Sequence, residues 1–199
     1  VRIMYPINSE NCKYIPIAND MKLRADAYSD LGVVVHEYGH HVGHTLGVSS
    51  LTPGDHTWDN NLADRLENKS WGIKLAWNEG TATVFSALAQ EYYADKLYGI
   101  QYAADASYTS YREKSSTISY ETGYDTKKGE ACEGEIITLF WDIYDSGNNE
   151  IHDTISLGHE TFKIIAASKA KTFSEFTEYF YAHYPQHRDA FNKLLTHHG

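Results

Sequence analysis

The sequence predicts an α+β fold in which a small N-terminal sheet is followed by helices over most of the chain. Residues 1–24 contain β-branched and aromatic runs, "VRIMY" and "KYIPI", and the prolines here suit edge strands or turns. Later segments place apolar residues at helical spacing and are separated by polar connections. The chain has 199 residues, 42% of them hydrophobic, which suits one domain with a sizeable core.

Three helices follow from the apolar spacing. The pattern changes from Ala27, and the first helix has its apolar residues between Leu31 and Leu46. The second runs from about Leu75 to about Tyr93, and the third from about Cys132 to Tyr144. Residues 47–70 are predicted to be an irregular connection, and residues 99–130 show no clear period. The chain beyond residue 153 is predicted to be helical, and "TFSE" at residues 172–175 fits a capping box at a helix start.

The first helix is predicted to have one apolar face and one face that carries histidines. Its apolar residues cluster within roughly 100° on a helical wheel, and we expect them to be buried in the core. They are Leu31, Val34, Val35, Tyr38, Val42 and Leu46. The other face carries histidines of the stretch "GVVVHEYGHHVGHTLG", residues 32–47, and we expect it to border a cleft.

Two of these histidines have the spacing of a zinc site. His36 and His40 are four residues apart, so on a helix they share one face and can bind one tetrahedral zinc. Glu37 lies about 100° further round the helix, where its carboxylate can act as a general base without binding the metal. A chance match on a polar helix face would also produce this pattern.

The other two histidines of the stretch are not expected to bind the metal. His44 lies a full turn beyond His40, and His41 projects from the flank of the helix. The metzincin class of zinc proteases is excluded, because Leu46 occupies the position of that class's third ligand and no methionine follows the motif.

A third ligand is predicted in "LAWNEGTATVFSAL". Glu79 lies near the start of the second predicted helix, where an acidic residue could simply complement the helix dipole. Together, however, "HEYGH" and "WNEGTA" resemble the gluzincin metallopeptidases, such as thermolysin and fungalysin. In these enzymes a glutamate on a second helix completes a His-His-Glu zinc site. The resemblance covers about residues 27–90 and continues more loosely to "CEGEIITLFWDIYD".

This resemblance implies a zincin-like fold and a zinc-dependent peptidase. His36, His40 and Glu79 would bind Zn²⁺, and Glu37 would be the general base. Residues 1–94 would form an upper subdomain with the zinc motifs, and residues 95–199 a mostly helical lower subdomain, with a peptide or protein substrate in the cleft between them. The "GAMEN"-type motif of aminopeptidases is absent, which favours an endopeptidase. The alternative is a zincin-like module that binds peptide or protein ligands with weak or no turnover.

Two positions depart from the thermolysin-like pattern. Thr83 stands where those enzymes have a carboxylate that orients a zinc-bound histidine, so this support is expected to come from elsewhere or to be weaker. No histidine precedes the third predicted helix to stabilise the oxyanion. Tyr120, Tyr124 and His152 are candidates for that role, and Tyr124 is the one we select. For each of them, ordinary packing or a surface position is the alternative.

The charge balance bears on partners and location. With 17 basic and 27 acidic residues the net charge is −10, which disfavours nucleic acid as a partner. No run approaches 18 apolar residues, so no membrane span is predicted. The acidic, tyrosine-rich composition, the possible disulfide and the family resemblance lead us to expect an exported bacterial protein, secreted or at the cell surface. Because no signal peptide opens the sequence, we expect either a trimmed form or a domain cut from a longer precursor.

Two further features are left open by the sequence. Cys12 and Cys132 are the only cysteines, and they could form a disulfide in an exported protein or remain two buried thiols. Residues 142–153 carry acidic and amide side chains that could bind calcium, but their spacing is not that of an EF-hand loop. A solvated loop is favoured there, and Zn²⁺ is the single predicted cofactor.

Overall fold

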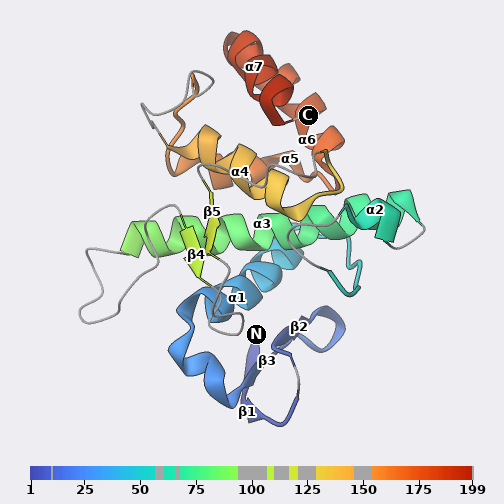
Figure 1. Ribbon diagram of the computed structural model, residues 1–199, viewed down its shortest axis with the longest axis vertical. Coiled ribbons are helices and arrows are strands. Elements are labelled where there is room, and N and C mark those ends of the chain that lie inside the picture. Colours follow the sequence, from blue (N-terminus) through green and yellow to red (C-terminus); the bar gives the residue numbers. More distant parts are fainter. Residues whose placement is uncertain are drawn as a thin grey trace.

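The computed structural model describes residues 1–9, 11–56, 61–65, 68–93, 107–109, 117–120, 129–145 and 154–198. Figure 1 shows its elements stacked along the long axis: a small sheet, then α1, α3 and α4, then the C-terminal helices. The predicted mixed α+β architecture with an N-terminal sheet is confirmed.

The N-terminal sheet has three strands, β1 (Arg2–Ile7), β2 (Lys13–Ile15) and β3 (Asp20–Arg24), in the order β1-β3-β2. The central strand β3 pairs in parallel with β1 and antiparallel with β2. A bidentate ion pair between Arg2 and Asp20, at 2.7 Å for each bond, ties β1 to β3. Because β2 is an edge strand, one side of its backbone is not paired within the sheet.

Helix α1 (Leu31–Leu46) has clear start and stop signals. The side chain of Asp30 accepts a hydrogen bond from the backbone N–H of Val33 at 3.1 Å, and Gly47 ends the helix with a left-handed φ of 73°. Short 3-10 helices occupy Pro16–Ala18, Ala25–Ser29 and Pro185–His187. The change of pattern from Ala27 falls in the 3-10 turn that leads into the helix, and α1 itself begins at Leu31, the first residue of the predicted apolar stripe.

The predicted burial of the apolar stripe on α1 is wrong. Tyr38 is 40% exposed and the other five residues of the stripe are half-buried, whereas the buried positions are Glu37, Gly39 and Gly43. The reason is the contact with α3 (Lys69–Tyr93): a Cβ atom at Gly39 would lie 2.7 Å from the carbonyl oxygen of Ala82. The glycine lets the two backbones approach, and the face that bears Glu37 is the one that becomes buried.

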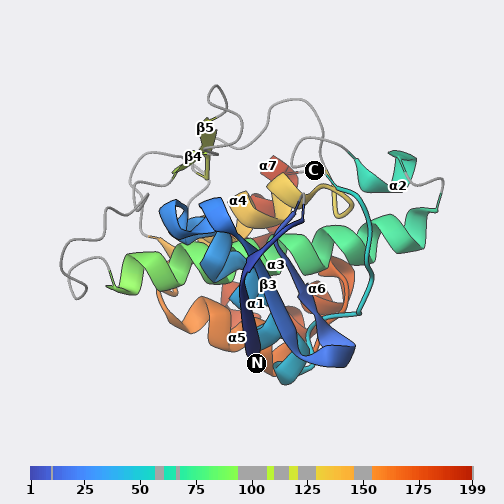
Figure 2. The ribbon, with the colours of Figure 1, turned by 90° about the horizontal axis from the view of Figure 1, so that it is seen from below.

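Helix α3 is the central element of the molecule (Figures 1 and 2) and is longer than predicted. Residues 75–84 are all buried, because α1 packs on one side of the helix and α4 (Glu133–Tyr144) on the other. A short helix, α2 (Leu62–Arg65), lies against its first turns. Since α3 begins at Lys69, Glu79 lies in its third turn, and the predicted first-turn position is wrong.

The larger hydrophobic core lies between α3, α4 and the C-terminal helices α5 (Glu160–Ser168), α6 (Phe173–His183) and α7 (Arg188–His198). The predicted cap of α6 is confirmed, because the Thr172 side chain accepts a hydrogen bond from the backbone N–H of Glu175. The sequence did not predict a two-stranded ribbon of β4 (Ser107–Thr109) and β5 (Thr117–Ser119). Among the residues described, no helix is long and apolar enough to cross a bilayer.

Cys12 and Cys132 are both in the thiol form, with no disulfide between them. Cys132 is buried at the start of α4, and Cys12 is half-buried and accepts a hydrogen bond from the backbone N–H of Arg24 at 3.4 Å. Of the two alternatives left open by the sequence, the structure contains the one without a disulfide.

A buried ion-pair network joins the end of α7 to α4. His198 Nδ1 lies 3.2 Å from Glu135 Oε2, and His198 Nε2 lies 2.8 Å from Asp142 Oδ2. Burial lowers the pKa of His198, but the hydrogen bonds and charges of the two carboxylates outweigh it and raise this pKa to about 9. The imidazolium form is therefore the one that links the two helices at neutral pH.

This network should make stability depend on pH. Because the folded-state pKa of His198 lies above its ordinary value of about 6.5, its stabilising contribution is complete below that value and is lost as the pH rises through about 9. In urea unfolding, His198→Gln should lower the free energy of unfolding by on the order of 3 kcal/mol near pH 6, and the deficit should shrink toward pH 10. His183→Gln, at an exposed position of α6, is the matched control. A deficit that does not change with pH would contradict the prediction.

Candidate metal centre

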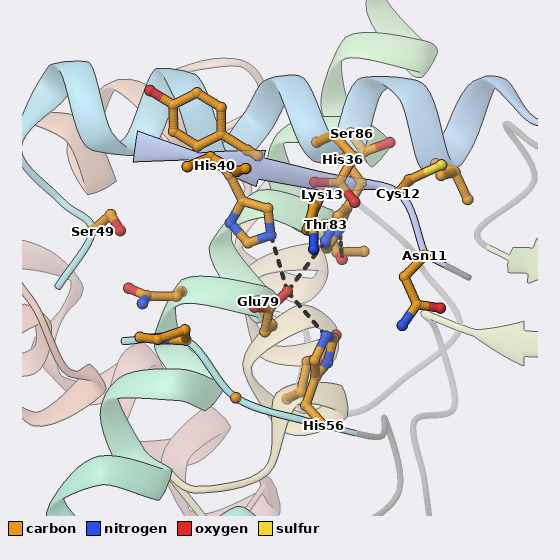
Figure 3. Close-up of a pocket in the computed structure, with 18 of the residues that line it drawn as sticks. Asn11, Cys12, Lys13, His36, His40, Ser49, His56, Glu79, Thr83 and Ser86 are labelled. Atoms are coloured by element: carbon orange, nitrogen blue, oxygen red, sulfur yellow. Dashed lines mark hydrogen bonds and ion pairs between the residues drawn. The ribbon is translucent and has the colours of Figure 1, made fainter. Parts of the chain in front are cut away.

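The structure brings the three predicted metal ligands together from two helices (Figure 3). His36 and His40 of α1 direct their Nε2 atoms to Glu79 Oε2 of α3, at 3.3 Å and 3.0 Å. The ligand atoms of the three residues all lie within 4.8 Å of one another. Zinc bonds of about 2.0–2.2 Å in a tetrahedron put neighbouring ligand atoms roughly 3.4 Å apart. Two imidazole nitrogens and one carboxylate oxygen at this spacing fit a zinc ion.

The electrostatics of the three residues favour a cation among them. Burial alone would lower the pKa of His40, but the charge and hydrogen bond of Glu79 raise it to about 9. Burial opposes ionisation of Glu79, yet the charge of His40 and the hydrogen bonds from His36 and His40 hold the pKa of Glu79 well below its usual value. A buried carboxylate of this kind needs positive charge beside it, supplied either by protons on histidine or by a metal ion that displaces them.

Thr83 orients the first of the histidine ligands. His36 Nδ1 lies 2.8 Å from Thr83 Oγ1, one helical turn after Glu79 on α3, so the opposite ring nitrogen of His36 faces Glu79. Fixing the second nitrogen of a ligating imidazole sets both the tautomer and the orientation of the ring. Of the two expectations, support from elsewhere and weaker support, the first does not hold, because the hydroxyl of Thr83 itself contacts His36. A neutral hydroxyl is a weaker partner for an imidazole than a carboxylate, which agrees with the second.

Glu37 is buried beside His36 and His40. Burial raises its pKa, and the neighbouring His40 and His36 oppose that rise. A carboxylate with a raised pKa is a stronger base than an exposed one, so it is better suited to accept a proton near neutral pH. The position of Glu37 is thus compatible with the predicted general base.

His41 and His44 hold strand β2 against α1. The hydroxyl of Tyr14, in the middle of β2, lies 3.3 Å from His41 Nδ1 and 3.1 Å from His44 Nδ1. Neither histidine belongs to the group of ligand atoms around Glu79. The prediction that they do not bind the metal agrees with this arrangement.

His56 is a site residue that the sequence analysis missed. Its Nε2 lies 3.5 Å from Glu79 Oε2, and its Nδ1 lies 2.8 Å from Oε2 of Glu133 at the start of α4. Burial lowers the pKa of His56, but the charge and hydrogen bond of Glu133, together with the charge of Glu79, raise it to about 10. Figure 3 shows His56 approaching Glu79 from the side opposite to His40. No local pattern marks a single histidine in an irregular segment, so only the folded chain reveals this position.

These residues lie in a cleft of about 1310 Å³. Strand β2 and its flanking residues form one wall, residues 49–56 form another, and α1 and α3 contribute His36, Glu37, His40 and Glu79. Tyr120 also lines the cleft and is buried against Trp141. Tyr124 and His152 lie outside the described residues, as does most of the acidic segment 142–153, namely residues 146–153.

Comparison with known proteins adds one finding. A family model described as the mycolysin C-terminal domain matches residues 3–198, which is nearly the whole chain and includes every residue of the metal centre. Neither the search of curated proteins nor that of solved structures gave a match. The match does not identify which residues bind a metal or react.

Proposed function

Because the chain belongs to the mycolysin C-terminal domain family, a domain of mycolysin-type metallopeptidases, we propose that it is itself a zincin-like zinc peptidase of the gluzincin type. The observation that supports this most is the convergence of His36, His40 and Glu79 in a cleft, with Glu37 buried beside them. Three protein ligands leave one tetrahedral position open, which is the arrangement of catalytic rather than structural zinc sites.

The chemistry follows from the residues around the metal position. Zinc, when bound, supplies a water of lowered pKa and polarises the carbonyl of the scissile peptide bond. Glu37 accepts one proton from that water as its oxygen adds to the carbonyl carbon. Glu37 then delivers the proton to the leaving amine as the C–N bond breaks. One peptide bond and one water become one carboxylic acid and one amine, the acid then passes its proton to the amine, and Glu37 returns to its starting state.

The cleft suggests how a substrate lies. The unpaired edge of β2 could add an extended peptide as a further strand, since backbone hydrogen bonds of this kind bind a peptide whatever its side chains. The proposed substrate is therefore a peptide or protein, and the proposed activity is that of an endopeptidase. Mycolysin-type proteases are secreted bacterial enzymes, and we propose the same location for this protein.

The direct test is metal-dependent proteolysis by the purified chain. We expect casein to be hydrolysed, the activity to disappear with 1,10-phenanthroline, and added zinc to restore it. A peptide blocked at both ends should be cleaved internally, which distinguishes an endopeptidase from an exopeptidase. If the zinc-loaded chain bound the blocked peptide in calorimetry without cleaving it or casein, the alternative of a zinc-containing binding module would replace the proposal.

A further inference from the structure

Asn78 of α3 carries a hydrogen-bond donor that no described residue uses. Its Oδ1 accepts hydrogen bonds from the backbone N–H of Ser50 at 3.0 Å and from Ser50 Oγ at 3.2 Å. A backbone N–H can only donate, so the amide oxygen faces Ser50 and the amide nitrogen, Nδ2, is directed away from it. Among the described residues, Nδ2 has no hydrogen-bond partner.

The amide nitrogen of Asn78 is accessible from the cleft. Asn78 is only 6% exposed, yet it lines the cleft. The described side-chain atoms that are sealed from solvent without a partner belong to Glu133 and Thr161, so Nδ2 of Asn78 is not sealed in this way. A donor that a bound ligand closes off from water costs free energy unless the ligand offers it an acceptor. Nδ2 therefore suits an acceptor that enters the cleft.

The segment that orients this amide is itself held in place. The indole Nε1 of Trp77 donates a hydrogen bond to the carbonyl oxygen of Val48 at 2.9 Å. Lys171 Nζ donates to the carbonyl oxygen of Ser49 at 2.8 Å. The chain that binds the oxygen of Asn78 is thus fixed on both sides, and a donor that is oriented before binding costs less entropy when the ligand arrives.

The donor lies across the cleft from β2. Figure 3 shows Ser49 and Lys13, one from each wall, on opposite sides of His40. Residues of a strand direct their N–H and C=O groups alternately to its two edges, so a peptide added to β2 would pair with it through every second residue. The carbonyl groups between would face away from β2, toward the wall of residues 49–56 beside which Asn78 lies. Inside a cleft these carbonyl groups need donors.

We infer that Asn78 is a further substrate-binding residue, whose Nδ2–H donates a hydrogen bond to a backbone carbonyl oxygen of an extended peptide bound along β2. The inference rests on the proposed peptidase function. The carbonyl of the scissile bond is directed to the metal position, so the acceptor is another carbonyl of the same peptide. This hydrogen bond is present before and during the reaction alike, and it therefore lowers KM while kcat changes little.

The test uses a blocked peptide and a series of analogues, in each of which one peptide group other than the scissile one is replaced by a trans carbon–carbon double bond. This replacement keeps the extended shape and removes the hydrogen-bonding groups. KM, kcat and zinc content are measured for the wild type, for Asn78→Asp and for the control Gln186→Ala, an exposed amide in the 3-10 helix Pro185–His187. Aspartate keeps the oxygen that Ser50 contacts but has no N–H to donate.

Several analogues should bind the wild type more weakly, since β2 also pairs with peptide groups. For one of them we expect a KM that is roughly 3–10-fold higher in the wild type and in Gln186→Ala. Asn78→Asp should show a rise of this size with the unmodified peptide already, and the same analogue should then bring no further rise. Asn78→Ala is measured in parallel, because it removes the donor without placing a charge next to Glu79, and it should show the same insensitivity.

If every analogue raised the KM of both Asn78 variants by the same factors as in the wild type, the inference would be overturned, since a general distortion of the cleft has no preferred peptide group. A KM for the unmodified peptide equal to that of the wild type would also overturn it. In both cases the wild type still cleaves the peptide, and the proposed function stands. A zinc-loaded wild type that does not cleave the unmodified peptide would overturn the proposed function and the inference with it.

Discussion

Replacing Glu37 by glutamine should abolish peptide hydrolysis and leave zinc bound. The amide keeps the size and hydrogen-bonding shape of the side chain but cannot accept a proton. General-base catalysis contributes about 10²–10⁴-fold to such reactions, so kcat should fall by that amount or more. The measurements are kcat on a blocked peptide and zinc content after removal of free metal. Glu178→Gln, an exposed glutamate on α6, is the control and should behave as the wild type.

Glu37→Gln should also affect the thermal stability of the metal-free protein. Burial raises the pKa of Glu37, so its ionised form is disfavoured in the folded, metal-free protein at neutral pH. The amide of glutamine is uncharged, so its burial does not carry the cost of burying an ionised carboxylate. The metal-free Glu37→Gln variant should therefore melt no lower than the wild type, as is common where a functional group is held at some cost to stability. Near-normal turnover in this variant would show that another group takes the proton.

The proximity of His36 and His40 on α1 could be predicted from the sequence because it depends on local geometry. Residues four apart on a helix share a face, so the positions of His36 and His40 followed once the segment was read as helical. Glu79 needed more than spacing, since its distance from the histidines depends on how two helices cross. Only the resemblance of "WNEGTA" to a known zinc motif indicated it. In the structure it is the Gly39–Ala82 contact that brings the two helices close enough.

The same contact explains why the burial prediction for α1 failed. A helical wheel assumes that the apolar face turns to the core, and on α1 that face includes Tyr38, which is 40% exposed. Gly39 and Gly43 add nothing to the apolar face of the wheel, yet both are buried, and a Cβ atom at Gly39 would lie 2.7 Å from the carbonyl oxygen of Ala82. This close approach favours burial of the polar face, on which His36 contacts Glu79 and Thr83 of α3 and His40 contacts Glu79.

The position of His56 beside Glu79 could not be predicted from the sequence, for a different reason. The residue belongs to a connection without periodic pattern, and its partner Glu133 is far along the chain, at the first turn of α4. Non-local pairs of this kind arise from the path of the chain across α3, which no spacing rule encodes. The predicted oxyanion donors Tyr120, Tyr124 and His152 lie close in sequence to the third predicted helix, whereas His56 comes from the connection before α3 and contacts Glu133 at the start of α4.

Removal of the third ligand should have the largest effect on the metal. In Glu79→Ala, His36 and His40 alone would hold the ion, and the charge that neutralises it would be gone. We expect zinc affinity to fall by more than roughly 100-fold, beyond the 10–100-fold typical of groups that merely support a ligand. Titration against a chelator of known affinity measures this, and hydrolysis should be lost at zinc concentrations that saturate the wild type.

The metal-free form of the same variant tests the electrostatics of the site. Glu79 supplies the charge and hydrogen bond that raise the pKa of His40 to about 9, and burial acts in the opposite direction. Without Glu79, the NMR titration of His40 should therefore move to lower pH. Glu91→Ala, on the same helix but outside the cleft, is the control and should leave both the titration and the zinc affinity unchanged. Undiminished zinc affinity in Glu79→Ala would exclude this glutamate as a ligand, and a shifted His40 titration in that case would show that it acts on the histidine alone.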